Sequence, residues 1–478
     1  MKKKSLMLLF IVASLLICII PSAGMILFKS NEAVGNEQQV EFPSFTTEDG
    51  KFNENVFEEM GTYFEKHFAF RPYVISVDAE IQSNVFKVSN LESVVVGKDD
   101  YLFYSSTLDN YLGRNIMSDR AIDNISHNLK ITQSYVQAQG ANFLFTVAPN
   151  KNSLYEENMP YYYKVKVSDE KNIDILKKSM EEYGINYCDL YPVFKNNDEV
   201  LYLKQDSHWN DKGAMLAYDT ILKKLNKPHP DFDADNATTA DFMGDLGKMI
   251  YPKTQKAEAN FDYSDSFDFE YTNEVKSVED PIIKTECENA SGNLYMYRDS
   301  FGNSILPFFA SSYKEAYFTK TFPLNLSLDM LVNKPDTVVI ELVERNLNWL
   351  NTMPAVIPSS QLTSYSITDK MDTALDVNAE ISMVNMSLIE VSGELPKEVQ
   401  TDGCDIYVQL TDKSGLKHLY EAYHTCTDNS DYGYLAYIPA ENYSVGDSSE
   451  VEISVVTKTD SNFTVVGTSM VTVKEAQI

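Results

Sequence analysis

An acidic residue stands two positions before a histidine in the stretch "LYLKQDSHWNDKGA" (Leu201–Ala214). The chain has 6 His and 2 Trp, and here His208 lies between Asp206 and Trp209. A short loop can present both side chains to one point, so that Asp206 orients His208 as a general base. Two other interpretations stay open: a solvated turn that caps a helix at Asp211, or a pair of metal ligands. Since no second His or carboxylate cluster stands at ligand spacing, we predict no metal site.

A serine stands directly after an apolar run in the stretch "NLYMYRDSFGNSILPFFA", which predicts a strand, a turn and a helix. Ser300 is therefore expected at the C-terminal edge of a sheet, close to the backbone N–H groups of a helix N-terminus. Such groups stabilise a developing oxyanion, although a Ser in this position commonly just caps the helix. With His208 as base and Asp206 as its orienter, Ser300 would have the partners that a nucleophile needs.

Short apolar strands alternate with helical segments from about residue 118 to residue 350. The runs "NFLFTVAPNK", "NLYMY", "EAYFT" and "DTVVIELVE" predict buried strands, and "DKGAMLAYDTILKKL" predicts a helix capped by Asn210 or Asp211. This alternation predicts an α/β domain at residues 46–360, with a mainly parallel sheet between two layers of helices. A polar, Asp- and Thr-rich stretch at residues 228–288 predicts an insertion with a helix at "GDLGKMI".

The pattern of apolar and polar residues changes near residue 371, where the two kinds alternate between clusters of turn residues. This pattern predicts an all-β, sandwich-like domain at residues 371–478. Cys404 and Cys426 flank two of its strand-like runs, and their spacing is compatible with a disulfide and with two free thiols alike.

The N-terminus carries Lys2, Lys3 and Lys4 before an uncharged apolar run that ends at Phe28. This run is long enough to cross a bilayer, so residues 1–30 predict a signal anchor whose lysines stay in the cytoplasm. The rival interpretation is a cleaved signal peptide in which Pro21 breaks the helix. Residues 31–45 predict a polar tether, and residues 52–86 have helical periodicity with a break at Pro72.

The formal charge of −30, from 40 Lys and Arg against 70 Asp and Glu, would repel a phosphate backbone. Nucleic acid is therefore excluded as an expected partner. The acidic balance also favours a neutral polymer over a uronic one.

These motifs together resemble the AlgX/AlgJ and DHHW proteins, which are SGNH-hydrolase-like domains of bacterial exopolysaccharide O-acetylation. "DSHWNDKGA" is similar to their Asp-Thr/Ser-His-Trp signature, and "RDSFGN" to their nucleophile block. "VVVGKDDYLFYSS", "VAPNKNSLYEENMP", "MGDLGKMI" and "VVIELVERNL" are similar to further family segments in the same order. The resemblance runs from about residue 41 to residue 350.

The resemblance implies a role for each residue that matches a motif. Ser300 would be the acyl nucleophile, His208 its general base and Asp206 the residue that orients His208. Further candidates for substrate or oxyanion contacts are Lys151, Trp209 and Arg298. Trp209 is alternatively a core aromatic, Lys151 a surface lysine, and Arg345 is expected in a structural ion pair. Arg298 stands where many SGNH proteins have Gly. From the oxyanion hole of the family we therefore assign only one donor in this sequence, the backbone N–H of Ser300.

The resemblance implies an extracytoplasmic O-acetyltransferase, without a cofactor, that acetylates a surface or secreted polysaccharide. A membrane-bound O-acyltransferase would supply the acetyl groups. The alternatives are an acetyl esterase with the same triad and a non-catalytic glycan-binding scaffold. Family members can carry a glycan-binding sandwich at the C-terminus, for which the candidate stacking residues are Tyr407, Tyr420, Tyr423, Tyr432 and Tyr434.

Overall fold

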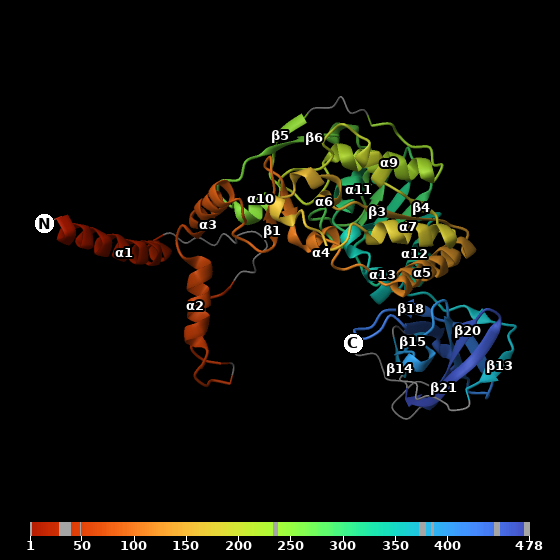
Figure 1. The fold of residues 1–478 in the computed structure, drawn as a ribbon. Helices are drawn as coiled ribbons and strands as arrows, with labels where there is room; N and C mark the ends of the chain where they lie inside the picture. The colour runs from red at the N-terminus through yellow and green to blue at the C-terminus, as the bar shows by residue number, and fades with distance from the viewer. Residues whose placement is uncertain are drawn as a thin grey trace.

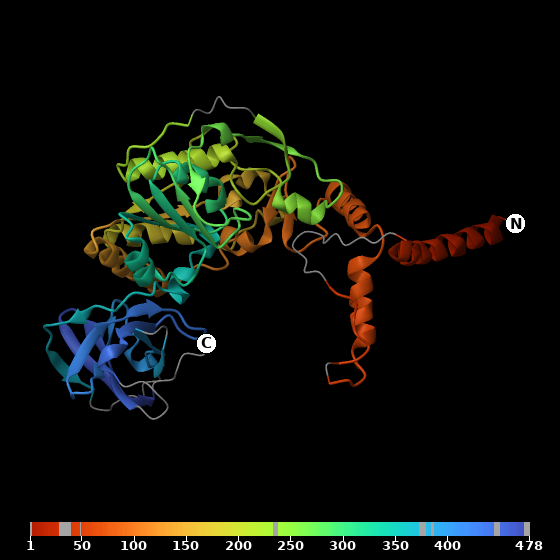
Figure 2. The same cartoon turned by 180° about the vertical axis from the view of Figure 1, so that it is seen from behind.

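An N-terminal helical region leads into an α/β domain, which is followed by a β domain (Figures 1 and 2). The tether predicted at residues 31–45 lies mostly outside the part of the chain that this computed structural model describes. The described residues are 2–27, 40–47, 49–232, 238–371, 379–383, 387–443 and 450–472.

The α/β domain is built on a seven-stranded sheet. The first five strands in spatial order pair in parallel, and the last two pair antiparallel at one edge. In this order the strands are β4 (Tyr187–Cys188), β3 (Asn142–Ala148), β11 (Thr337–Val343), β9 (Asn293–Tyr297), β10 (Glu315–Thr319), β8 (Ile282–Glu286) and β7 (Glu270–Tyr271).

Both faces of this sheet are buried. Successive residues of each strand point to opposite sides, so each strand contributes side chains to a core on either face. On β3, Phe143 and Phe145 pack with α5 (Asp119–Ala138) and α7 (Asn172–Glu182). Leu144 and Ala148 lie in the other core, with α9 (Asp211–Lys224) and α11 (Gly302–Ala310). The sheet is therefore the middle layer of three, as Figure 2 shows.

The segment predicted as an insertion is folded around the edge of this domain. It contains the β5 (Thr238–Phe242) and β6 (Glu258–Phe261) hairpin, and α10 (Asp245–Ile250) forms at the predicted "GDLGKMI". Its last part supplies the edge strands β7 and β8. Before it, β1 (Val94–Val96) and β2 (Leu102–Tyr104) form the predicted hairpin, whose turn holds Asp99 and Asp100 at positive φ.

Two sheets make up the β domain, and their facing side chains form one core. The six-stranded sheet has the order β12 (Gln361–Leu362), β17 (Lys417–Glu421), β16 (Asp405–Thr411), β20 (Glu450–Thr459), β21 (Asn462–Thr472) and β13 (Ile367–Lys370). The four-stranded sheet has the order β14 (Ala379–Met383), β15 (Leu388–Glu394), β19 (Gly433–Pro439) and β18 (Tyr423–Thr425). Cys404 and Cys426 are free thiols, which decides between the two alternatives left open by their spacing.

The apolar N-terminal run forms α1 (Lys2–Leu27), which continues through Pro21 instead of ending there. By length and composition, residues Lys4–Met25 of this helix fit a membrane span or a signal sequence. The periodic segment after it forms α2 (Val56–His67), α3 (Arg71–Ile81) and the short π-helix η1 (Gln82–Phe86). Pro72 lies in the first turn of α3, where a proline starts a helix and does not break one.

Candidate active site

Ser300 lies in the tight turn between the end of β9 and the start of α11. The side chain of Asp299 fixes this turn by accepting three hydrogen bonds. Its Oδ1 accepts from the N–H of Phe301 (2.9 Å), and its Oδ2 from the N–H of Val343 (2.7 Å) and the amide of Asn346 (3.1 Å). The turn is thereby tied to the end of the neighbouring strand β11, and Ser300 stands at the C-terminal edge of the sheet.

The structure brings Ser300, His208 and Asp206 together in one hydrogen-bonded chain. The Nε2 of His208 lies 2.8 Å from the Oγ of Ser300, and its Nδ1 lies 2.7 Å from the Oδ1 of Asp206. Asp206 also accepts the backbone N–H of His208 (2.9 Å) and that of Asp245 (2.8 Å). With three donors on an ionised Asp206, the proton of the neutral imidazole lies on Nδ1, and Nε2 is free to accept from Ser300.

In this hydrogen-bonded chain, the charges of Asp206 and His208 stabilise each other. Burial alone would raise the pKa of Asp206, but the hydrogen bond and charge of His208 and two backbone amides lower it to about 2. Burial lowers the pKa of His208, yet the hydrogen bond and charge of Asp206 and the charge of Asp245 outweigh it and raise that pKa. Arg345 acts in the opposite direction on His208. His208 is therefore a stronger base than a free imidazole.

Lys151 holds the loop that carries Asp206 and His208. Its ammonium is buried and donates to the backbone carbonyls of Leu203 (3.1 Å), Lys204 (2.9 Å) and Asp206 (2.5 Å). Desolvation lowers the pKa of Lys151 to about 8, against the favourable charges of nearby carboxylates. Lys151 is neither a surface lysine nor open to a substrate, because its three donors are directed at the loop.

Two acidic residues of the insertion complete the support of this loop. Asp245, the first residue of α10, accepts from the N–H (2.8 Å) and hydroxyl (2.7 Å) of Ser207. Glu258 on β6 accepts the backbone N–H groups of Lys204 (2.6 Å) and Gln205 (2.9 Å). Our sequence reasoning did not identify these two residues, although "MGDLGKMI" marked the segment that contains Asp245.

Trp209 lies behind the site, whereas Arg298 is one of the residues that line the cavity at Ser300. Trp209 is completely buried, stacks on Phe194 and meets Phe301 edge-on. Of the two alternatives for this residue, it is therefore a core aromatic and not a substrate contact. The guanidinium of the buried Arg298 donates to the carbonyl of Val278 (2.9 Å) and to the side chain of Asn303 (2.5 Å). Through these two hydrogen bonds, Arg298 joins the insertion to α11.

The structural ion pair that we expected for Arg345 does not form among the described residues. Its neighbour Glu344 turns inward, where it accepts the N–H of Asn150 (3.0 Å) and the hydroxyl of Tyr191 (2.6 Å). The guanidinium of Arg345 instead lies over the ring of Tyr104, 5.5 Å from its centroid, and forms no ion pair with any described residue. It is the cationic group beside the nucleophile.

A cavity of about 480 Å³ opens at Ser300. Its polar lining includes Arg345, Asn346 and Lys320, although Lys320 is paired with Glu279 (2.6 Å). Its aromatic lining consists of Tyr104, Phe322 and Trp349. The cavity can therefore hold a ligand with both an apolar ring face and several hydrogen-bonding groups.

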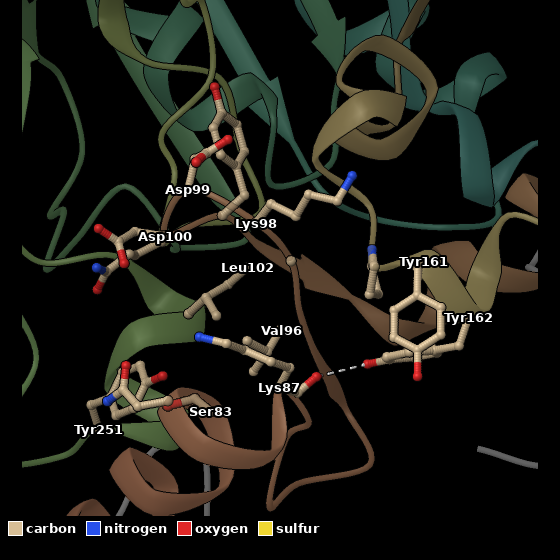
Figure 3. A pocket seen from close by; sticks show the side chains of 15 residues that line it. Ser83, Lys87, Val96, Lys98, Asp99, Asp100, Leu102, Tyr161, Tyr162 and Tyr251 are labelled. Atoms are coloured by element: carbon tan, nitrogen blue, oxygen red, sulfur yellow. Dashed lines mark hydrogen bonds between the residues drawn. The ribbon is translucent and has the colours of Figure 1, made fainter.

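A second hollow of about 510 Å³ lies on the other side of the β1–β2 hairpin and is lined in part by Gln205 of the catalytic loop. Figure 3 shows Tyr161 and Tyr162 on one side of it and Asp100 and Tyr251 on the other. The hydroxyl of Tyr162 donates to the carbonyl of Lys87 (3.4 Å), which closes one corner.

Two groups of side chains place three possible metal-ligand atoms within 4.8 Å of one another. In the group of Asp206, His208 and Asp245, the His208 Nδ1 already donates to Asp206, so a cation there would break the proton relay. The second group is His127, His424 and Asp405, where the imidazoles stack at 3.8 Å and 4°. Because their lone pairs lie in parallel planes, they do not converge on one ion.

Four of the five tyrosines proposed as glycan platforms are buried in the β domain: Tyr407, Tyr420, Tyr423 and Tyr434. The fifth, Tyr432, is partly exposed, but the guanidinium of Arg120 covers its ring at 4.9 Å. None of the five offers a free ring face to a sugar, which corrects that expectation.

Residues 94–282 match the sequence profile of a family described as ALGX, the SGNH hydrolase-like domain of the acetyltransferase AlgX. The resemblance inferred from the motifs is thus confirmed, and the α/β domain is SGNH-hydrolase-like. The match contains Asp206 and His208 and ends before Ser300.

Solved structures with similar folds include PatB1 of Bacillus cereus, with 17% identity, a TM-score of 0.44, and coverage of 53% of this chain and 96% of that one. A DHHW family protein from Eubacterium siraeum has 18% identity and a TM-score of 0.43, with coverage of 54% and 93%. AlgX of Pseudomonas aeruginosa has 12% identity and a TM-score of 0.36, with coverage of 83% and 94%. A comparison with curated protein sequences finds no match.

Proposed function

We propose that this protein is an extracytoplasmic O-acetyltransferase that moves an acetyl group through Ser300 onto a hydroxyl of a polysaccharide. The observation that carries the proposal is the chain of hydrogen bonds from Ser300 through His208 to Asp206 at the mouth of a cavity. The AlgX acetyltransferase profile over residues 94–282 supports the acetyl group as cargo.

The first half-reaction forms an acetyl-enzyme. The Oγ of Ser300 attacks the carbonyl carbon of the acetyl donor while Nε2 of His208 takes the hydroxyl proton. When the tetrahedral intermediate collapses, the bond to the donor's leaving group breaks and that group receives the proton from His208. Asp206 stays ionised throughout and stabilises the imidazolium that exists between the two proton transfers.

The backbone N–H of Ser300 would hold the oxyanion of this intermediate, since it donates to no described residue. The guanidinium of Arg345 lies at the same cavity and adds positive charge where the oxyanion develops. We therefore assign Arg345 to substrate or oxyanion binding.

The second half-reaction reverses these roles. A sugar hydroxyl gives its proton to His208 and attacks the acetyl carbon, and Ser300 leaves as the alkoxide that recovers the proton. The aromatic residues of the cavity, Tyr104, Phe322 and Trp349, would carry the ring of the acceptor sugar and exclude water. The acceptor is a polysaccharide, and a membrane-bound O-acyltransferase supplies the acetyl groups near the anchor α1.

A fluorophosphonate probe of serine nucleophiles tests the first half-reaction. We expect the wild type to be labelled and Ser300→Ala to remain unlabelled, with Ser266→Ala, at an exposed serine outside the loop 203–208, as a control that keeps the nucleophile. If the wild type is unlabelled while the protein still binds polysaccharide, the protein is a scaffold.

Acetyl transfer to an oligosaccharide, measured against release of acetate, tests the second half-reaction. Transfer in excess of hydrolysis supports the transferase, whereas hydrolysis alone identifies an acetyl esterase. Unchanged polymer acetylation in cells that carry Ser300→Ala would refute the central role of this serine.

A further inference from the structure

One face of the helix formed by α3 and η1 is apolar and exposed to solvent. Phe70, Val74, Val77, Ile81 and Val85 follow one another at intervals of three or four residues, and between 46% and 68% of each is exposed. This spacing puts all five on one side of the helix, and we call them the apolar stripe. A water-soluble surface seldom leaves a continuous row of this kind uncovered.

The opposite face of α3 fixes the stripe in this outward orientation. Ala79 is buried against Leu246 and Ile250 of α10, in a small core that also includes the β1–β2 hairpin. The hydroxyl of Ser76 accepts the backbone N–H of Lys253, 2.9 Å away. The helix therefore cannot roll the stripe inward without breaking its contact with the α/β domain.

The stripe begins beside the C-terminal part of α1. The backbone N–H of Ala69 donates to the carbonyl of Pro21 (3.3 Å), and Gly24 lies against Ala69 and Phe70. Pro21 precedes the end of α1, Leu27, by six residues, or about 9 Å of helix rise. If α1 crosses a bilayer, the first residue of the stripe lies at the depth of the boundary between headgroups and acyl chains.

We propose that the apolar stripe rests in the outer interfacial layer of the bilayer that α1 crosses. Lipid is the occupant that the structure favours, because the stripe is continuous with an apolar helix of spanning length. Figures 1 and 2 show α1 projecting from the molecule, with the end of α2 and the beginning of α3 near its C-terminal end. This contact would give the catalytic domain a second attachment to the membrane.

Such an attachment sets the position of the active site. The stripe is rigidly joined to α10, whose first residue, Asp245, donates its N–H to Asp206. The second hollow is lined by Ser83 and Asn84 of η1, by Lys87 and by Gln205 of the loop 203–208 (Figure 3). The hollow therefore lies between the helix that carries the stripe and the loop that carries Asp206 and His208.

Quenching of tryptophan fluorescence by brominated lipid tests the proposal with the full chain. The chain with Val77→Trp is reconstituted into phosphatidylcholine vesicles that carry bromine on the acyl chains. We expect quenching beyond that of the two native tryptophans, of which Trp209 is buried. The matched control is Val165→Trp, since Val165 is 86% exposed on the α/β domain and should stay unquenched.

Val12→Trp in α1 serves as the positive control for insertion. If Val12→Trp is quenched and Val77→Trp is not, the stripe does not contact lipid and the proposal is wrong. A photo-crosslinker at position 77 that captures a protein instead of lipid would also overturn it, in favour of a protein partner. Neither outcome depends on acetyl transfer, so the test is independent of the proposed function.

Discussion

In the proposed mechanism Ser300 gives its proton to His208, and two residues of opposite charge adjust how strongly that imidazole holds it. Asp245 raises the pKa of His208 and Arg345 lowers it. Since the base acts in its neutral form, activity should rise with pH, with an inflection above the ordinary value of 6.5. The measurement is kcat/KM for an acetyl ester as a function of pH.

Replacement of Asp245 by Asn should move this inflection to lower pH, because a charge that favours the imidazolium is lost. Asp262→Asn, at an exposed position away from the loop, should leave the profile unchanged. A shift to higher pH in Asp245→Asn would contradict the electrostatic assignment.

Replacement of Arg345 by Gln should shift the inflection the other way, to higher pH, because the positive charge no longer opposes protonation of His208. If Arg345 also holds the oxyanion, kcat should fall by about 10²-fold or more at pH values where His208 is neutral. An unchanged kcat with a raised KM would restrict Arg345 to acceptor binding.

Asp206→Asn keeps the size of the side chain but removes the charge that stabilises the imidazolium. We expect kcat to fall about 10³–10⁴-fold while the fold is retained, as circular dichroism would verify. Asp198→Asn, at an exposed position, is the control. A loss below tenfold would mean that Asp206 only shapes the loop.

At the residue scale, the sequence indicated the three side chains with chemical roles, because Ser, His and Asp stand in recognisable motifs. It did not indicate Asp245 or Glu258, since their partners are backbone amides of the loop 203–208, and a sequence motif does not encode such contacts. The expected ion pair of Arg345 rested on Glu344 before it, but residues Glu344–Asn346 form a 3-10 turn, in which consecutive side chains point about 120° apart.

Among the elements, the loop 203–208 receives three hydrogen bonds from a single ammonium group, beside its contacts with Asp245 and Glu258. Lys151→Met keeps much of the side-chain volume but removes this donor from the carbonyls of Leu203 and Asp206, and leaves that of Lys204 with only the N–H of Leu102. We expect the free energy of unfolding to fall by about 3 kcal/mol, with a parallel loss of kcat. Urea denaturation measures this, with the exposed Lys130→Met as control. Equal stability of both variants would show that the loop keeps its conformation without the hydrogen bonds from Lys151.

Gly244 is the point where α10 approaches this loop most closely. A Cβ there would overlap the backbone of Gln205 and Asp206. Gly244→Ala should therefore push the N–H of Asp245 away from Asp206, lower kcat, and destabilise the fold by about 1–3 kcal/mol. In Gly61→Ala, where a Cβ meets nothing, activity should be unchanged. Full activity of Gly244→Ala would mean that α10 is dispensable for catalysis.

Periodicity was sufficient to predict the strands and helices around the site. Asn210 is the N-cap of α9, as predicted, and its side chain accepts the N–H of Gly213 at 2.9 Å. In the apolar run "INYCDLYPVF" only Tyr187–Cys188 forms a strand, because Pro192 lies in the first turn of a short helix (Tyr191–Lys195). The clamp by Lys151 joins segments more than 50 residues apart, which no local pattern encodes.

In the whole molecule, α5 joins the two domains with polar side chains. Its sequence is that of a polar helix, yet Asn128 is buried and pairs with both the carbonyl (2.7 Å) and the N–H (3.1 Å) of His424 on β18. Asn124 donates to the carbonyl of Asp431 (2.8 Å) in the same way. A polar helix can thus be buried where its partner is the backbone of another domain, and composition alone does not predict this.

The stacked His127 and His424 make this joint sensitive to acid. Burial lowers the pKa of both rings; Asp405 and Asp123 oppose the effect at His127, whereas Arg120 reinforces it at both. Because the folded pKa values lie below 6.5, the unfolded chain binds protons first, and stability is lost as the pH falls below 6.5.

Urea denaturation at pH 7.5 and pH 5.5 should therefore show a lower free energy of unfolding in acid. In His127→Phe, which keeps an aromatic ring next to His424, the difference between the two pH values should be smaller. An equal acid loss in both proteins would place the titrating groups elsewhere.

The turn that holds Ser300 cannot exist until the chain has been made well beyond it. Strand β9 lies between β10 and β11, which both follow it in the chain, and Asp299 takes two of its three donors from Val343 and Asn346. His208 emerges from synthesis earlier, 92 residues before Ser300. A shorter nascent chain therefore lacks the hydrogen bonds that fix this turn, and the proposed triad can assemble only when the domain is complete.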